Sequence, residues 1–485
     1  STDGLPPILI DGQHRLSAGQ VKELLRALSA AERHPLAMAV HDRADRLSRD
    51  RFALALVHLW LAAGAPAKLS WLMTGAGWLG DSEFVNTLTP LIREWPGVSQ
   101  HQRAVKGLTA LRNVASDEAL QQISGIAAKV KFAGLKKRAG QAMDEIAAQR
   151  GFTRDELEDR VIPDGGLDER GTRIFDYGTR RFLAYVTPDG KLAARILDAE
   201  GHPAGKALST LPTPNKSDNS EQAKAAKAEY NLVKKAVTTL AKVQLARFER
   251  AMIQDRRWAP EDHARFIAPH PVLRHLLAGI IWGLYDTENT LTGTARVDED
   301  GHLVDPDDEP MDTDGCSIGI VHPLELDDTT KAAWGEVLAD YELAQPFKQL
   351  DRPTFRLPED QGNDTKLHDL PKGTFPAAKL IGAFTKYGWE RGEALDAGSY
   401  CIHALTIPPA NLTAVIRYTG MWMGPMTEQE DQEIEAAYIL KGCHDPKNLG
   451  WGDEMDTKGL ERVPWNQAPP TIVSEILATL ETIRG

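Results

Sequence analysis

Apolar residues recur at helical spacing through the first third of the chain. Val21, Leu24, Leu25 and Leu28 stand at i, i+3, i+4 and i+7, which makes one apolar stripe along a helix. The segment DRFALALVHLWLAAG is apolar nearly all round, which predicts a helix at the centre of the packing. Further helices are predicted, with short connections, over 81–94, 100–114, 116–130 and 135–150.

Capping residues mark the ends of several of these helices. Ser116 stands before two acidic residues as an N-cap, Gly151 follows Arg150 as a C-cap, and Thr153 opens a capping box. The helices last about 14–16 residues and their pairs recur at roughly 35–40 residues. That spacing resembles HEAT-type helical pairs, so we expect residues 1–155 to form a helical-repeat domain.

The hydrophobic period changes from helix to strand after this domain. Alternation at period 2, with turns at Pro188–Gly190 and Glu200–Gly201, predicts a small β-meander within 156–215. The segment TLPTPNKSDNSEQ (210–222) is rich in Pro, Ser and Asn, which is typical of a linker.

A long helix is predicted next. Residues 220–254 are rich in Ala, Lys and Glu and lack Gly and Pro. Two more helices follow, the second over HPVLRHLLAGIIWGLYD, so 216–290 is expected to hold a long helix and a helical pair.

The remaining residues, 291–485, mix both periods and are expected to form an α+β C-terminal domain. Strands are predicted over 291–321, 399–407 and 411–418. Helices are predicted over 329–341, 375–389, 428–440 and 471–484. The expected fold class is mainly α with α+β parts, in which helical repeats precede a mixed α/β region with small antiparallel sheets.

Composition bounds the cellular setting. The chain has no run of about 18 apolar residues, and its beginning lacks the basic and apolar stretches of a signal peptide. Cys316, Cys401 and Cys443 are dispersed and form no CxxC pair. We therefore expect a cytoplasmic protein with no membrane segment, no disulfide, no zinc or other metal, and no cofactor.

Charge is uneven along the chain. The net charge is −13, yet residues 1–150 hold 19 Lys+Arg against 14 Asp+Glu, a net of +5. A basic stretch bridges two predicted helices and is either a polyanion site or a solvated connection. Its members are Lys129, Lys131, Lys136, Lys137 and Arg138.

The best candidate for a ligand site lies between residues 322 and 352. Gln345, Gln349 and Arg352, with His322 and Trp334, offer amides and a bidentate guanidinium that suit a planar polar ligand or a carboxylate. The same groups also suit a buried network that joins a helix end to a sheet, and that interpretation is favoured.

Two further clusters allow two interpretations each. Trp389 and Arg391, in KYGWERG, are able to stack on a base or ring, or else to close a helix end and fill the core. The acidic run 298–314 suits calcium or magnesium, but it lacks EF-hand spacing and is equally typical of hairpin loops.

Four blocks carry a family resemblance. They are QLARFERAMIQDRRWAPEDHARFIAPHPVLRHLLAGIIWGLYD, GIVHPLELDDTTKAAWGEVLADYELAQPFKQLDRPTF, KLIGAFTKYGWERGEALDAGSY and PPTIVSEIL. Together they resemble a bacterial family of unknown function that includes the molybdate-metabolism-regulator-like proteins, over roughly residues 160–485. The resemblance implies a fold but no established reaction.

The leading hypothesis for function is a non-enzymatic interaction or regulatory scaffold that binds an acidic macromolecular partner. Helical repeats present extended surfaces, and no P-loop, GxGxxG, GxSxG, HExxH or kinase signature occurs. A protein partner is favoured over nucleic acid, because an excess of five charges is small for a phosphate-tracking groove. The alternatives are an enzyme or small-ligand binder with a site in 322–391, and nucleic-acid binding through the basic N-terminal helices.

Overall fold

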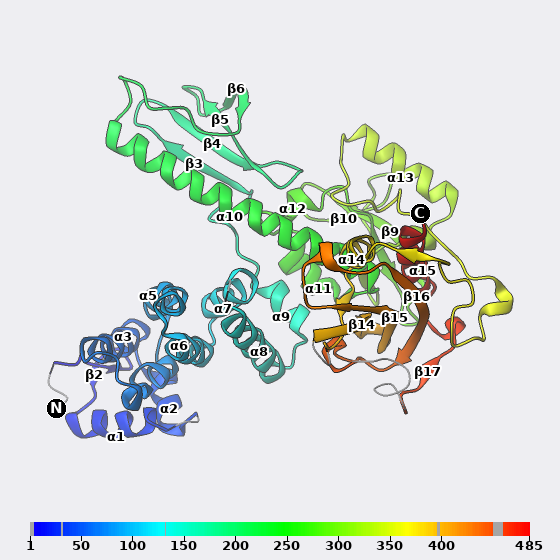
Figure 1. Ribbon diagram of the computed structural model, residues 1–485. Coiled ribbons are helices and arrows are strands. Elements are labelled where there is room, and N and C mark those ends of the chain that lie inside the picture. The colour runs from blue at the N-terminus through cyan, green and yellow to red at the C-terminus, as the bar shows by residue number, and fades with distance from the viewer. Residues whose placement is uncertain (1–3, 31–32, 131, 395–397, 450–458) are drawn as a thin grey trace. The chain divides into compact units, whose positions relative to one another are not determined.

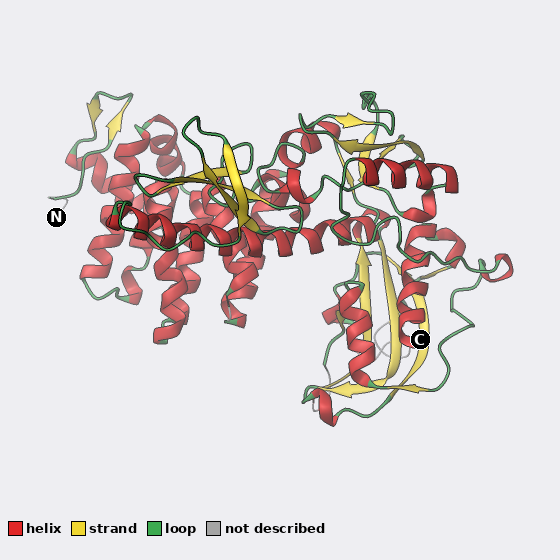
Figure 2. Cartoon of the chain, turned by 90° about the horizontal axis from the view of Figure 1, so that it is seen from above, coloured by secondary structure: helices red, strands yellow, loops and turns green. Residues whose placement is uncertain are grey.

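A computed structural model gives the arrangement of the chain (Figures 1 and 2). It describes residues 4–30, 33–130, 132–394, 398–449 and 459–485. The chain divides into two compact units, Ser1–Pro163 and Asp164–Gly485. A mixed α/β protein with several small antiparallel sheets is confirmed.

The first unit is helical. Its core includes Phe52, Leu56 and Trp60 from the buried face of α3. The opposite face of this helix is not enclosed, because Leu47 and Leu59 are exposed. From α5 onward, each helix up to α9 packs against the next in sequence. The helices are α1 (Ala18–Leu28), α2 (Pro35–Arg43), α3 (Arg46–Ala62), α4 (Trp71–Thr74), α5 (Ser82–Glu94), α6 (His101–Val114), α7 (Asp117–Lys129), α8 (Ala133–Arg150) and α9 (Arg154–Arg160). A hairpin of β1 (Leu9–Ile10) and β2 (His14–Arg15) precedes them.

The predicted caps of this unit are confirmed. Ser116 accepts a hydrogen bond from the backbone N–H of Ala119, and Thr153 forms a reciprocal capping box with Glu156. Gly151 ends α8 in the left-handed conformation, with φ of 73°.

The second unit begins with a four-stranded antiparallel meander. Its strands follow chain order: β3 (Thr172–Asp176), β4 (Arg181–Val186), β5 (Leu192–Leu197) and β6 (Pro203–Leu208). One face packs on the long helix α10 (Ser220–Ile253), where Phe175 meets Tyr230 edge-on at 5.4 Å between ring centroids. The predicted meander and long helix are therefore both present.

The predicted linker at 210–222 is anchored to the meander instead. Asp218 is buried and forms an ion pair with Arg180 at 2.6 Å, and Tyr177 Oη donates to the carbonyl of Pro212. Asn219 then caps α10. Polar composition alone does not distinguish a linker from a segment whose polar side chains bond to a neighbouring sheet.

A five-stranded antiparallel sheet follows, in the order β10-β9-β8-β11-β7. Its strands are β7 (Arg257–Trp258), β8 (Trp282–Tyr285), β9 (Leu291–Val297), β10 (Leu303–Val304) and β11 (Ser317–Ile320). Helix α13 (Asp328–Asp340) packs on it through Trp334. The helix predicted over HPVLRHLLAGIIWGLYD is wrong beyond α12 (Leu273–Leu276), because a fully buried strand shows no alternation that separates it from a helix.

The last sheet has the order β12-β16-β15-β14-β13, with β17 (Arg462–Val463) beside β16. Its strands are β12 (Thr374–Phe375), β13 (Glu390–Arg391), β14 (Ser399–Ile407), β15 (Leu412–Trp422) and β16 (Gln432–Lys441). Helices α14 (Ala377–Lys386) and α15 (Pro470–Arg484) share its core. The helix predicted over 428–440 is wrong: β16 pairs along β15, so tertiary pairing overrides the helical propensity of its Ala and Glu residues.

No helix in the described part of the chain is both long enough and apolar enough to cross a membrane.

The two units are expected to fold as separate polypeptides, 1–163 and 164–485, because each contains its own buried cluster. Circular dichroism of each fragment should show native-like secondary structure and a cooperative thermal transition. A fragment that stays unfolded while the whole chain folds would contradict this division.

Candidate functional site

Arg352 is the centre of the site predicted between residues 322 and 352. Its Nε and Nη2 atoms contact both carboxylate oxygens of Glu475 on α15, at 2.7 and 2.8 Å. Its Nη1 atom donates to Glu249 on α10 at 2.8 Å. Arg352 is 8% exposed and Glu475 1%, so this bidentate ion pair is buried.

His322 joins the same carboxylate. Its Nε2 lies 2.9 Å from Glu475 Oε1, and its Nδ1 accepts the backbone N–H of Leu324. This pattern makes Nε2 the nitrogen that donates to the carboxylate. Burial raises the pKa of Glu475, but the hydrogen bonds from Arg352 and His322 outweigh burial and hold that pKa below its usual value.

The two glutamines cross-link strand ends. Gln349 is 1% exposed; its Oε1 accepts the N–H of Ile281, and its Nε2 donates to the carbonyls of Ile281 and Val321. Gln345 donates to Gln349 Oε1 at 3.0 Å. The Gln349 amide thus has four protein partners, two on each atom, and it fixes the residue before β8 to the residue after β11.

The two tryptophans of the predicted sites, Trp334 and Trp389, are core residues whose indole N–H groups have partners. Trp334 Nε1 donates to Thr294 at 2.8 Å, and Trp389 Nε1 donates to Thr479, one turn along α15 from Glu475. Arg391 lies on β13, where its guanidinium stands 5.0 Å over the ring of Tyr400. Three of the predicted site residues bond to α15, namely His322, Arg352 and Trp389. The two glutamines bond instead to each other and to the residues at the ends of β8 and β11, Trp334 bonds to β9, and Arg391 is separate on β13.

Glu475 and Glu249 are the functional partners that sequence reasoning missed. Glu475 interrupts the apolar run TIVSEILATL, and a carboxylate there is a signal of a buried pair, since unpaired buried charges are rare.

A second polar cluster adjoins His322. Arg257 lies 3.4 Å over the ring of Tyr285 and forms an ion pair with Asp255 at 2.5 Å. Tyr285 Oη donates to Glu325 at 2.9 Å, and the same carboxylate accepts the backbone N–H of His322. Burial raises the pKa of Glu325. The hydrogen bond from the backbone of His322 to Glu325 connects the two clusters into one network.

His263 lies in an aromatic cluster with Phe248, Trp258 and Trp282. It belongs to a turn of π-helix (η4, His263–Ile267) and contacts the ring of Trp282 at 4.4 Å between centroids. Among the described residues, neither His263 Nε2 nor Trp282 Nε1 has a hydrogen-bond partner. Burial lowers the pKa of His263 to about 3.

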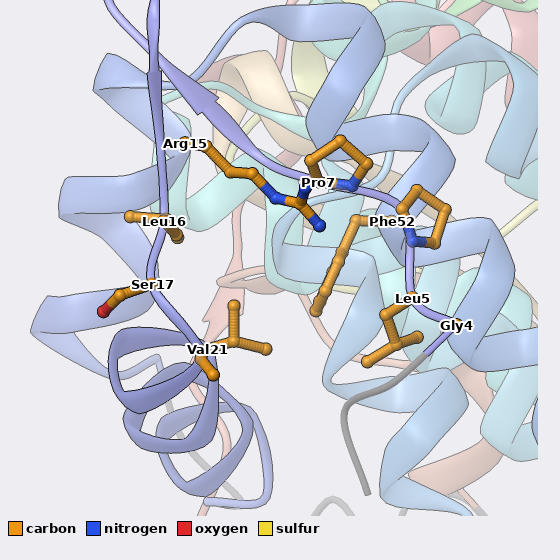
Figure 3. A pocket seen from close by; sticks show the side chains of 10 residues that line it. Gly4, Leu5, Pro7, Arg15, Leu16, Ser17, Val21 and Phe52 are labelled. Atoms are coloured by element: carbon orange, nitrogen blue, oxygen red, sulfur yellow. The ribbon is translucent and has the colours of Figure 1, made fainter.

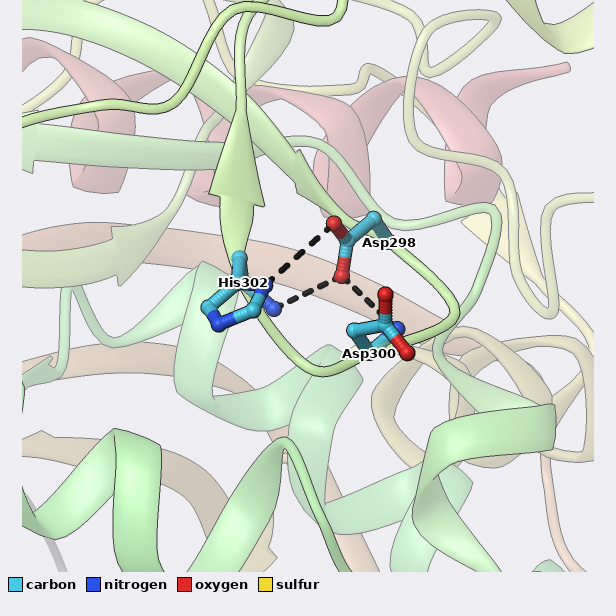
Figure 4. Close-up of side chains that lie close together, drawn as sticks. All are labelled: Asp298, Asp300 and His302. Carbon is cyan, nitrogen blue, oxygen red and sulfur yellow. Dashed lines mark hydrogen bonds and ion pairs between the residues drawn. The ribbon is translucent and has the colours of Figure 1, made fainter.

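The acidic run contributes one group with metal-ligand geometry. Asp298, Asp300 and His302 place their ligand atoms within 4.8 Å of one another on the hairpin from β9 to β10 (Figure 4). Asp298 Oδ1 also accepts the backbone N–H groups of Asp300 and His302, so this carboxylate already stabilises the turn.

The predicted basic stretch is only partly available to a partner. Lys136 and Lys137 are exposed on α8, whereas Arg138 shares Glu145 with Arg112 through ion pairs of 2.7 Å. Lys131 and the side chain of Lys129 lie outside the described residues.

A cleft of roughly 500 Å³ lies in the first unit (Figure 3). Apolar side chains that line it include Leu5, Pro7, Val21 and Phe52, and Arg15 is its charged residue. None of the sequence-predicted site residues lines it.

The comparisons with known proteins agree with the sequence resemblance. Residues 205–389 match the model of a family described as Domain of unknown function (DUF4132). The chain is also similar to a protein of Escherichia coli (strain K12) that is named Uncharacterized protein YehI, with 33% identity over 344 residues. The aligned part is 70% of this chain and 28% of the relative, so the chain spans less than a third of that protein's length. No solved structure matches the chain.

A relation to a bacterial family of unknown function is therefore confirmed. Neither the family nor the relative carries a name that refers to molybdate metabolism, so that part of the resemblance stays a prediction.

Replacing Arg352 by Ala is expected to lower the free energy of unfolding by about 3–5 kcal/mol, because it leaves the Glu475 carboxylate buried without its cation. Chemical denaturation measures this. The matched control is Arg356→Ala, an exposed arginine four residues away, for which a change below about 1 kcal/mol is expected. Unchanged stability of Arg352→Ala together with loss of a bound ligand would instead favour a ligand site.

Acid should destabilise the protein through His263. Unfolded histidine takes a proton near pH 6.5, whereas buried His263 stays neutral down to about pH 3. As pH falls through that window, the unfolded state binds the extra proton and the free energy of unfolding decreases. Replacing His263 by Phe should reduce this slope by roughly 1 kcal/mol per pH unit in denaturation curves. His14→Phe, an exposed control, should leave the slope unchanged; an equal slope in all three proteins would refute the assignment.

Proposed function

We propose that this chain is a non-enzymatic interaction or regulatory scaffold of the bacterial cytoplasm, whose N-terminal helices recognise an acidic macromolecular partner. One observation carries the proposal: the side chains best suited to ligand chemistry in 322–391 bond to one another and to the backbone in a buried network. Groups engaged in this way hold elements together and are not presented to a substrate.

The first unit suits recognition of a large partner. Consecutive helices that pack against one another through short connections support the proposal of HEAT-like repeats, and stacked repeats present extended faces. Lys136 and Lys137 place two charges on the exposed side of α8. Exposed charges contribute little to folding but steer association with an oppositely charged surface.

The runner-up function is an enzyme or small-ligand binder in the 322–391 region. It requires access to Arg352 or His322, which are 8% and 1% exposed. It is tested by the Arg352→Ala comparison above, since a ligand site loses binding without losing stability.

Reversing Lys136 and Lys137 to Glu should weaken partner capture and flatten its salt dependence, because the variant removes the charges that attract an acidic surface. The measurement is affinity capture by the whole chain from a nuclease-treated bacterial lysate at several salt concentrations. The melting temperature should not change.

The matched control carries the same charge change elsewhere: Lys372→Glu with Lys447→Glu, both exposed in the second unit. The proposal fails if the α8 variant captures the same partners with the same salt response as the unmodified chain. A second capture from a lysate without nuclease treatment is the comparison. Capture that occurs in the untreated lysate and is absent from the treated one would identify nucleic acid as the partner.

A further inference from the structure

The meander has one face that α10 does not cover. Phe175 on β3 and Phe182 on β4 point toward α10 and are buried. Side chains alternate along strands, so their neighbours point the other way. We call the opposite side the outer sheet face and define it by Ile174, Asp176, Arg181, Leu183, Tyr185, Ala193 and Arg195.

Strand register sets the pattern of this outer sheet face. Leu183 lies between Ile174 on β3 and Arg195 on β5, and Tyr185 lies beside Ala193. Ile174 is 52% exposed, and both arginines are exposed. An aliphatic and aromatic centre thus has two guanidinium groups beside it on one face of the sheet. Figure 1 shows the strands of this meander beside α10.

The meander and α10 are basic within an acidic unit. Residues 171–250 hold 14 Lys+Arg against 8 Asp+Glu, a net of +6, whereas 251–485 hold 20 against 40, a net of −20. Asp218 and Glu229 are already paired with Arg180 and Arg173. Within the described part of the chain, no ion pair involves Arg181 or Arg195, although the exposed Asp176 stands directly opposite Arg181 in the strand register.

We propose that the outer sheet face binds single-stranded nucleic acid. Tyr185 and the guanidinium planes offer surfaces on which bases stack, Ile174 and Leu183 cover the edges of those bases, and the arginines attract phosphates. This inference is independent of the partner proposed for α8, because it uses a different unit of the chain.

The distance between successive side chains along β4 favours single strands over duplexes. Arg181, Leu183 and Tyr185 follow one another on the same side of β4 at about 6.6–6.8 Å, two residues of strand rise apart. That is roughly twice the 3.4 Å step between nucleotides along a duplex strand. Bases must therefore separate to meet successive side chains, which single strands permit and paired, stacked bases do not.

Fluorescence anisotropy of the whole chain with a labelled single-stranded oligonucleotide of roughly 12 nucleotides tests the proposal. The same sequence as a duplex is the comparison. Single-strand binding should be at least about tenfold tighter than duplex binding, and it should weaken as salt rises from about 50 to 200 mM.

Variants of the arginines and of Tyr185 separate the contribution of charge from that of base stacking. Arg181→Glu with Arg195→Glu should weaken binding more than about tenfold and reduce the salt slope by about 2, one for each lost phosphate contact. Tyr185→Ala should weaken binding about five- to tenfold with an unchanged salt slope, and Tyr185→Phe should restore it. The control pair Lys372→Glu with Lys447→Glu makes the same charge change and should leave affinity within about twofold.

Three outcomes would overturn the inference. One is the absence of single-strand binding, or equal binding of the duplex. Another is loss of binding in the Lys136→Glu, Lys137→Glu variant but not in the arginine pair, which would place the site on α8. The third is self-association in sedimentation that the arginine pair abolishes, which would make the acidic region of a second copy the occupant.

Discussion

The buried ion pair between Arg352 and Glu475 is the interaction on which the second unit depends. A carboxylate that is 1% exposed is costly in a protein interior unless its charge and both oxygens are satisfied. Arg352 supplies two parallel hydrogen bonds, and His322 supplies a third. The pair thereby fixes where α15 lies against the end of β11 and the segment that follows α13.

The rest of the network extends this constraint outward. Glu249 ties Arg352 to α10, and Gln349 ties the same segment to the backbone at both Ile281 and Val321. A network in which each amide and guanidinium atom has a protein partner resists rearrangement, because moving one member leaves others unpaired in a low dielectric. Amide, guanidinium and imidazole groups that are suited to binding a ligand thus hold the elements of the second unit in one packing arrangement.

Helix α10 connects this network, which lies in the acidic part of the second unit, with the basic meander. Its N-terminal half covers the inner face of the basic meander, and its C-terminal half carries Glu249 into the acidic region.

The family match at 205–389 begins inside the meander and includes α10 and the glutamine segment, while β3 to β5 lie outside it. The two proposed surfaces, on α8 and on the outer sheet face, lie in different units and use charge that folding does not require.

The sequence by itself determined the elements whose signals are local. The long helix begins at its Asn219 cap, the strand over 399–407 has its predicted bounds, and the caps at Ser116 and Thr153 form as expected. The sequence also favoured a buried network of His322, Gln345, Gln349 and Arg352 that joins a helix end to a sheet. In the structure, His322 and Arg352 share Glu475, and the two glutamines bond to each other. Only tertiary structure decided that 432–441 is a strand and that Trp282–Tyr285 is not helical. It also selected Glu475, which is 123 residues from Arg352 along the chain, as the partner of that arginine. The physical reason is that caps and periodicity act within a few residues, whereas strand pairing and the neutralisation of a buried charge depend on which distant segments the core brings together.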